Sequence, residues 1–195
     1  MSFRVGVLSL QGDVIEHISA LQAAGAETLP VRTPVDLDRC DALVIPGGES
    51  TTIEKLARIF EVYEPIKQRI SAGMPVFGTC AGMIMLADRI AGGTADQTSF
   101  GGLDITVRRN AFGRQIASFE ADIAVAGLED PFHAVFIRAP WVEEIGPGVE
   151  VLATDPTSDR IVAVRQGVLM ATAFHPEIGG DHRIHDMFLS MATQN

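Results

Sequence analysis

The 195-residue sequence contains only two cysteines, no long apolar run and no cluster of basic residues. Such a low cysteine number is typical of the reducing cytosol and provides no disulfide framework. No stretch approaches the roughly 20 apolar residues that cross a bilayer, and the N-terminus lacks the basic and apolar regions of a secretory signal. We therefore expect a cytoplasmic protein without membrane contact.

The charge balance is acidic, with 15 basic against 25 acidic side chains and a net charge of −10. The net negative charge repels a phosphate backbone, which argues against nucleic acid as a partner. Hydrophobic residues make up 47% and charged residues 21% of the chain, which argues against disorder. Because no repeat or Pro/Gly/Ser-rich linker divides the sequence, we expect a single domain over residues 1–195.

The first half of the chain alternates short apolar runs with helical patterns. Asp13 and Glu16 predict the N-terminal cap of the first helix, and Gly25 its end. The second half is richer in strand patterns, which we expect to extend the same sheet. Together they predict an α/β fold with a single doubly wound, mostly parallel, flavodoxin-like sheet and added antiparallel strands. Strands are expected at 4–10, 28–31, 42–46, 75–79, 103–109, 116–125, 134–139, 149–154, 160–166 and 168–174, and helices at 13–25, 53–60, 65–72, 81–92 and 182–194.

Cys80 lies between Gly78 and Gly82, where a predicted strand gives way to a predicted helix. This arrangement is typical of the strained turn that exposes a nucleophile in α/β enzymes. The helix beginning near Ala81 would favour the thiolate, and the Ala81 N–H would be one oxyanion donor. The plainer alternative is a small buried cysteine in a glycine-rich turn. Cys40 has no motif around it, and we expect it to be inert.

Two further motifs follow strands that should end at the same edge of the sheet as Cys80. His175 ends an apolar run, and Glu177 follows two residues later, so the carboxylate can orient the imidazole as a base for a thiol. The pair of glycines in the segment PGGES, residues 46–50, predicts a second oxyanion donor at Gly48. No Gly-Lys-Ser/Thr follows, so this is not a lysine-bearing phosphate loop. Each motif alone is also compatible with an ordinary turn.

These motifs together resemble the class I, or triad, glutamine amidotransferases. The resemblance narrows to the glutaminase subunits of pyridoxal 5'-phosphate synthase and covers nearly the whole chain. Its most specific parts are the segments RNAFGRQ and FIRAP. The matching segments are LQGDVIEH at 10–17, PGGESTT at 46–52, FGTCAGM at 77–83, RNAFGRQIASFEAD at 109–122, FIRAP at 136–140 and FHPE at 174–177.

The resemblance implies hydrolysis of L-glutamine to glutamate and ammonia, with no metal or organic cofactor. Cys80 would be the nucleophile, His175 the acid and base, and Glu177 its orienting partner. Ammonia would pass to a separate synthase subunit, the protein partner, which makes pyridoxal 5'-phosphate from ribose 5-phosphate and glyceraldehyde 3-phosphate.

The resemblance also implies which residues bind the substrate. Glutamine carries a carboxylate and an ammonium, so its site needs a cation and an anion. Arg109 or Arg138 can supply the cation and Glu49 the anion, although either arginine can equally be a solvated or ion-paired strand end. The implied glutamine-binding residues are Gly47, Gly48, Glu49, Arg109, Ile137 and Arg138.

Other functions remain open at this point. The triad is shared across the superfamily, so the chain can serve another biosynthetic synthase. Related doubly wound folds place a cysteine on such a turn in thiol redox or stress proteins, but these do not need Glu177 or the paired glycines. A non-enzymatic interaction domain leaves the three strand-end motifs without a reason.

The remaining polar residues have plainer interpretations. His182 and His185 lie near two aspartates at the start of the last helix, but no cysteine or third histidine completes a tetrahedral site, so we expect no metal. Gln11, Glu16 and His17 are expected to cap the first helix and to lie on the surface. The resemblance suggests a role for them at the synthase interface as well.

Overall fold

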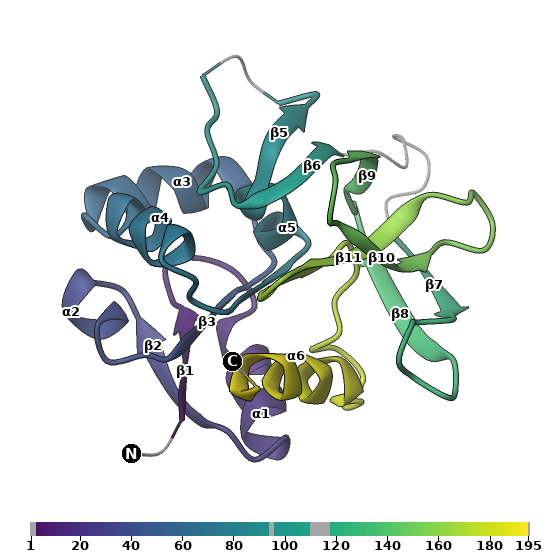
Figure 1. The fold of residues 1–195 in the computed structure, drawn as a ribbon, viewed down its shortest axis with the longest axis horizontal. Coiled ribbons are helices and arrows are strands. Elements are labelled where there is room, and N and C mark those ends of the chain that lie inside the picture. Colours follow the sequence, from purple (N-terminus) through teal and green to yellow (C-terminus); the bar gives the residue numbers. More distant parts are fainter. Residues whose placement is uncertain (1–2, 94–95, 110–117, 195) are drawn as a thin grey trace.

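The computed structural model describes residues 3–93, 96–109 and 118–194, and its centre is a large mixed sheet (Figure 1). Neighbouring strands in this sheet follow the order β2-β1-β3-β4-β12-β11-β9-β6-β5, and β10 pairs with β11 beside that path. Five adjacent strands, β2 to β12 in this order, are parallel to one another. The strands of this sheet are β1 Arg4–Leu8, β2 Glu27–Val31, β3 Ala42–Ile45, β4 Val76–Thr79, β5 Ala87–Ala91, β6 Leu103–Arg108, β9 Trp141–Ile145, β10 Glu150–Thr154, β11 Ile161–Gln166 and β12 Leu169–Thr172.

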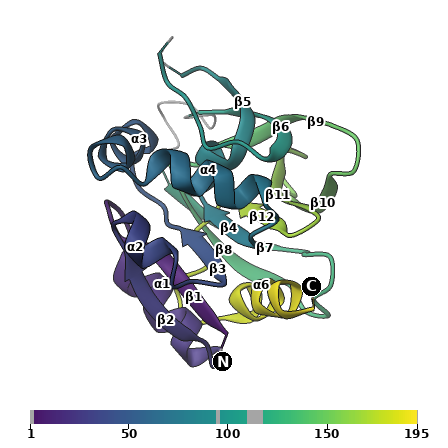
Figure 2. The same cartoon turned by 60° about the vertical axis from the view of Figure 1, so that its left-hand side comes forward.

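Helices cover both faces of the parallel part, which explains why β3, β4 and β12 are buried along their whole length. Helices α1 and α6 contact each other on one face, and the remaining helices form a connected layer on the other (Figures 1 and 2). The helices are α1 Val14–Ala23, α2 Pro34–Leu37, α3 Ser50–Ile59, α4 Tyr63–Ser71, α5 Ala81–Leu86 and α6 Arg183–Thr193. The predicted doubly wound α/β fold is confirmed. Within the described residues, no helix is long and apolar enough to cross a membrane.

The expectation that every strand of the second half joins one sheet was wrong. Strands β7 Ser118–Ile123 and β8 Phe132–Ile137 form a separate antiparallel pair. Phe136 of β8 packs on Phe174, with ring centroids 5.7 Å apart, at the segment that follows β12. This hairpin therefore covers the end of the parallel sheet.

The predicted helix over 81–92 was also wrong in its second half. Helix α5 ends at Leu86, because the carbonyl of Met85 accepts hydrogen bonds from the N–H groups of Phe100 and Gly101 at 2.8 and 3.2 Å. The chain continues as β5, where Arg89 hydrogen-bonds to Thr106 of β6. The short helix α2 and strand β9 were not predicted from the sequence.

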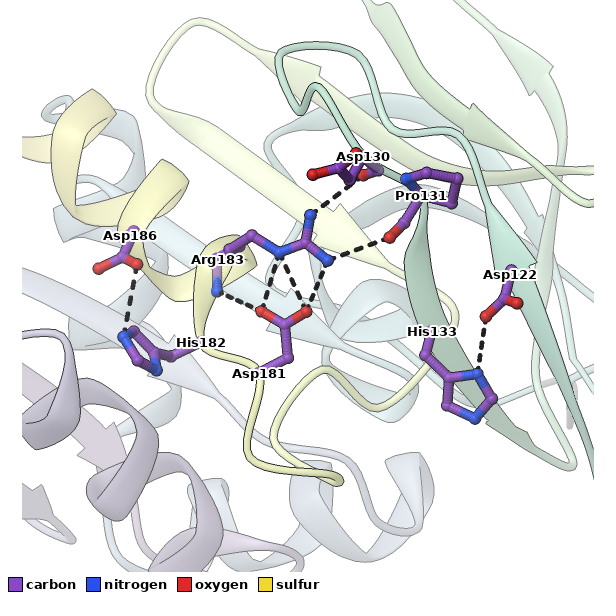
Figure 3. A network of polar contacts seen from close by, with 8 residues as sticks. All are labelled: Asp122, Asp130, Pro131, His133, Asp181, His182, Arg183 and Asp186. Atoms are coloured by element: carbon purple, nitrogen blue, oxygen red, sulfur yellow. Dashed lines mark hydrogen bonds and ion pairs between the residues drawn. The ribbon is translucent and has the colours of Figure 1, made fainter.

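Arg183 fixes the start of α6 against the loop before β8 (Figure 3). Its guanidinium forms a two-point ion pair with Asp181, at 2.7 and 3.1 Å, and donates to the carbonyl groups of Asp130 and Pro131 at 3.0 Å. These contacts connect the segment between β12 and α6 with the β7–β8 hairpin. They hold these two segments in place relative to each other.

Candidate functional site

The carboxyl ends of the parallel strands meet at one edge of the sheet, beside a cavity of about 330 Å³. The chain after β1, β3, β4 and β12 contributes to its wall, as does the chain after β8. The described residues that line the cavity are Gln11, Gly48, Glu49, Ser50, Cys80, Ala81, Ile84, Arg109, Ile137, Arg138, Pro140 and His175. Its volume suits a small polar metabolite.

Cys80 occupies a strained backbone conformation between β4 and α5. Its φ of 48° and ψ of −103° are unusual for a residue with a side chain, and they turn the thiol toward the cavity. The N–H of Cys80 donates to the carbonyl of Thr172 at 2.8 Å, which ties this turn to β12. The strained turn that the sequence predicts at Cys80 is therefore present.

The two flanking glycines allow this turn to pass close to its neighbours. A Cβ atom at Gly82 would lie 2.1 Å from the carbonyl oxygen of Ile45, and one at Gly78 would lie 2.5 Å from the backbone of Gly82. No larger residue fits either place without moving backbone. The N–H group of Ala81, the first of α5, has no partner within the helix, and Ala81 lines the cavity.

His175 and Glu177 form a buried pair beside Cys80. The Nδ1 atom of His175 lies 2.7 Å from Oε1 of Glu177, and both residues are less than a tenth exposed. The backbone N–H of His175 donates to the carbonyl of Val135 in β8 at 2.9 Å. With Nδ1 held by the carboxylate, Nε2 remains for the thiol.

The proton affinity of this pair is high. Burial disfavours the imidazolium, but hydrogen bonds with Asp13, Cys80 and Glu177 outweigh it and raise the pKa of His175. Burial raises the pKa of the Glu177 carboxyl as well, although the hydrogen bond with His175 opposes that rise. The pair therefore holds one proton tightly.

Asp13 lies beside the same imidazole and does not cap α1 with its side chain. It is the N-cap residue of α1, as predicted, but its Oδ2 atom lies 3.2 Å from Nδ1 of His175. Asp13, His175 and Glu177 each offer a ligand atom within 4.8 Å of the others, which is a spacing that a metal ion could use. Because His175 and Glu177 are already bonded to each other at 2.7 Å, an ion would have to separate them.

His17 is fully buried, so the expectation that it lies on the surface was wrong. Its ring contacts Thr79 Oγ1 and His185 Nε2, each at 3.0 Å, behind the pair formed by His175 and Glu177. His185 is buried as well, whereas His182 is half-buried and lies 3.8 Å from Asp186 (Figure 3). His182, the N-cap residue of the last helix, and His185 within it therefore lie in different surroundings.

The loop after β3 places Gly47, Gly48 and Glu49 at the site in different roles. Gly47 packs against the imidazole, since a Cβ atom there would lie 2.5 Å from Cε1 of His175. Gly48 and Glu49 line the cavity, and the Glu49 N–H donates to Oε1 of Gln11 at 2.7 Å. Gln11 thus fixes the loop, a role that the sequence reasoning missed although this residue directly follows the strand expected at 4–10.

Arg109 and Glu49 form an ion pair at 2.9 Å on the cavity wall. Gln97 accepts a second hydrogen bond from Arg109 at 2.5 Å. Partial burial opposes ionisation of Glu49, but hydrogen bonds from Thr51 and Thr52 outweigh it and lower the pKa of Glu49 to about 2. The wall therefore presents a fixed positive and a fixed negative charge side by side.

Ile137 and Arg138 approach the cavity from the end of β8. The thiol of Cys80 lies 3.9 Å from the carbonyl oxygen of Ile137. Arg138 has a positive φ of 45° and is exposed, and no hydrogen bond or ion pair of its guanidinium is found among the described residues. The rest of the RNAFGRQ segment, 110–115, lies outside the described residues.

All the residues predicted for this site except Gly47 and Glu177 line the cavity, and these two contact His175. The sequence reasoning missed Gln11, Ser50, Ile84 and Pro140 in the wall, and Asp13 beside the imidazole. Ser50 follows the predicted glycine loop directly, so its position in the sequence gave a usable signal. Ile84 and Pro140 carry no chemical signal of their own.

Comparisons with known proteins agree with this geometry. The model of the SNO glutamine amidotransferase family matches residues 7–194. A pyridoxal 5'-phosphate synthase subunit PdxT from a Nocardioides species is 64% identical, covering 97% of this chain and 96% of the relative, and one from Salinispora arenicola is 61% identical, covering 96% and 95%.

Solved structures are similar over the whole fold. A crystal structure of a glutamine amidotransferase is 49% identical with a TM-score of 0.90, covering 97% of this chain and 98% of the other. PurLQS from Thermotoga maritima has a TM-score of 0.71 at 17% identity, covering 97% and 99%, and shares the fold alone. The chain belongs to the SNO glutamine amidotransferase family.

Proposed function

We propose that this protein hydrolyses L-glutamine to glutamate and ammonia through a thioester on Cys80. The observation that carries the proposal is the strained Cys80 beside the buried pair of His175 and Glu177, at a cavity that also contains an Arg109–Glu49 ion pair. A nucleophile, a base and a place for a zwitterion are the three requirements of this reaction.

In the first half of the reaction, His175 takes the thiol proton and the sulfur attacks the side-chain amide carbon of glutamine. The negative charge moves to the carbonyl oxygen, which the N–H groups of Ala81 and Gly48 stabilise. His175 then gives its proton to the amide nitrogen, the carbon–nitrogen bond breaks, and ammonia leaves a glutamyl thioester on Cys80. Glu177 keeps the imidazole in the tautomer that this transfer needs.

In the second half, water takes the place of ammonia. His175 accepts a proton from the water as its oxygen attacks the thioester carbon. The carbon–sulfur bond breaks, the thiolate recovers the proton from His175, and glutamate is released. Each proton that enters the cycle leaves with a product, so the enzyme returns to its initial state.

The backbone end of glutamine is held by the Arg109–Glu49 pair. An α-amino acid carries a carboxylate next to an ammonium, and this pair offers the opposite charges in adjacent positions. Arg109 is the preferred partner of the carboxylate, because its side chain is only 14% exposed and Glu49 and Gln97 fix its direction. Arg138, which is exposed, is a second cation at the rim.

Ammonia passes to a separate synthase subunit that makes pyridoxal 5'-phosphate from ribose 5-phosphate and glyceraldehyde 3-phosphate. The curated relatives named as subunits of this synthase, at 60% identity or more over 95% of their length, support this partner. We place the reaction in the cytoplasm, where a reducing environment keeps the Cys80 thiol free.

The test is an assay of glutamine-dependent ammonia release with and without that synthase subunit. We expect release with both subunits present, and a fall of at least about 10⁴-fold in Cys80→Ala, because the nucleophile is lost. An unchanged rate in this variant would remove Cys80 from the reaction. A thiol redox protein would show no ammonia release, and recovery of a different synthase in a pull-down would change the partner.

A further inference from the structure

The structure contains a second histidine behind the pair formed by His175 and Glu177. We propose that His17 is a positioning residue for Glu177, and that its Nε2–H holds the outer oxygen of that carboxylate while the inner oxygen holds His175. This inference rests on the glutaminase function proposed above, and it deepens the account of the same site.

The geometry places His17 next to the one oxygen of Glu177 that His175 does not use. Oε1 of Glu177 is bonded to His175, whereas Oε2 lies 3.4 Å from Nε2 of His17. Oε2 is buried and no hydrogen bond to it is found among the described residues, so Nε2 of His17 at 3.4 Å is a close polar contact that is longer than an ordinary hydrogen bond. Both side chains are fully buried, so water does not compete for this contact.

Hydrogen bonding selects the tautomer of His17. Burial, together with the charges of His185 and His175, lowers the pKa of His17 well below its usual value, so the ring is neutral and carries one N–H. If that hydrogen were on Nδ1, the Nε2 lone pair would accept from Thr79 but would also lie 3.4 Å from the Glu177 carboxylate oxygen, which repels it, and His185 would be left with a buried Nδ1–H that has no acceptor among the described residues.

With the hydrogen on Nε2, the contacts are consistent. His17 donates to Thr79 Oγ1 at 3.0 Å and toward Glu177 Oε2, and its Nδ1 accepts from Nε2–H of His185 at 3.0 Å. In this arrangement of the described residues, the Nδ1 acceptor of His185 is left without a partner and Thr79 needs another acceptor for its hydroxyl hydrogen, but a polar N–H and not a nitrogen lone pair lies next to the Glu177 carboxylate. His185 thereby fixes the ring of His17, as His17 fixes Glu177.

Glu177 needs this support because a second carboxylate competes for the same imidazole nitrogen. Asp13 lies 3.2 Å from Nδ1 of His175, and its side chain is 41% exposed. A Glu177 that rotates away leaves His175 to this more exposed partner. His17 therefore affects the direction of the imidazole without touching the substrate, and its loss should lower kcat and leave KM nearly unchanged.

The experiment compares His17→Gln with His17→Asn in the complex with the synthase subunit. The Gln amide nitrogen reaches the position of Nε2, whereas the shorter Asn does not. We expect His17→Gln to keep kcat within about threefold, and His17→Asn and His17→Leu to lose about 10- to 100-fold, with KM within about twofold. If His17→Leu does not fold, the Gln and Asn pair carries the test, and His133→Gln, on the exposed hairpin, is the neutral control.

A double-mutant cycle separates positioning from general packing. In a Glu177→Gln background, His17→Asn should cost less than about twofold, because the group through which it acts is already changed. Equal kcat in His17→Gln and His17→Asn, or a full loss in the Glu177→Gln background, would overturn the inference. Wild-type protein without glutaminase activity would instead overturn the proposed function, whereas active wild type, inactive Cys80→Ala and unaffected His17 variants would overturn this inference alone.

Discussion

Replacing Gly47 by alanine should inactivate the enzyme while leaving it folded. The added Cβ atom would lie 2.5 Å from Cε1 and 3.0 Å from Nδ1 of His175, whereas ordinary contacts of a Cβ atom begin near 3.4 Å. The imidazole must therefore retreat by about 0.9 Å, the difference between 3.4 and 2.5 Å. A displacement of about 1 Å in a catalytic group can cost about 100-fold in rate, and we expect kcat to fall by that factor.

The backbone itself accepts alanine at this position. The φ angle of Gly47 is outside the left-handed region that favours glycine. The steric overlap costs about 1–3 kcal/mol, and the reduced freedom of the unfolded chain offsets about 0.4–1 kcal/mol of it. The variant should therefore remain folded at the assay temperature, with its loss confined to kcat.

Gly148→Ala is the matched control for this prediction. Gly148 has a φ of 80°, and among the described residues no atom lies within 4 Å of the place that a Cβ atom would take, so alanine there strains the backbone without touching the site. It should lose about 1 kcal/mol of stability and keep wild-type kcat. The assay is ammonia release at saturating glutamine, with a thermal melt of each variant. A Gly47→Ala enzyme with kcat within threefold of wild type would refute the reasoning.

Three further predictions follow from the charges and thiols. Arg109→Met should raise KM for glutamine by about 10- to 100-fold with little change in kcat, because a charge-assisted bond to bound substrate is lost, and a change confined to kcat in steady-state kinetics would contradict this. Burial, and then the charge of His182, lowers the pKa of His185 to about 4 from its usual 6.5. Between pH 4 and 6.5, the imidazole of His185 is therefore protonated in the unfolded chain and neutral in the folded chain. Stability should therefore fall as the pH drops from 6.5 to 4, by up to roughly 3 kcal/mol, and His185→Leu should flatten that slope in urea titrations; an equal slope in the variant would count against it. A glutamine-analogue electrophile should label Cys80 and leave Cys40 unmodified in peptide mass spectra, because burial raises the pKa of Cys40 to about 11; equal labelling of both thiols would be the opposite result.

The sequence was sufficient to predict the parallel half of the fold and the cysteine turn. Apolar runs such as 42–46 are buried on both faces, and Gly78 and Gly82 each have a backbone neighbour that excludes a side chain. These features depend on neighbours that are close in sequence or on a regular pattern. Local pattern was therefore enough for them.

The features that the sequence did not predict depend on distant neighbours. Helix α5 ends at Leu86 because residues 100 and 101 donate to Met85, and no local signal precedes that end. His17 has the spacing of a helix residue, but its burial follows from the packing of α1 against α6, more than 160 residues later. Asp13 has the pattern of a helix cap, yet the imidazole of His175 lies close to its carboxylate.

The thioester on Cys80 is the most direct test of the account. Protein mixed with excess L-glutamine and the synthase subunit, quenched in acid during turnover, should yield a glutamyl adduct on the peptide that contains Cys80. Cys80→Ala should yield neither adduct nor glutamate. Steady glutamate production by the wild type without any adduct, at a rate that Cys80→Ala shares, would contradict the central claim.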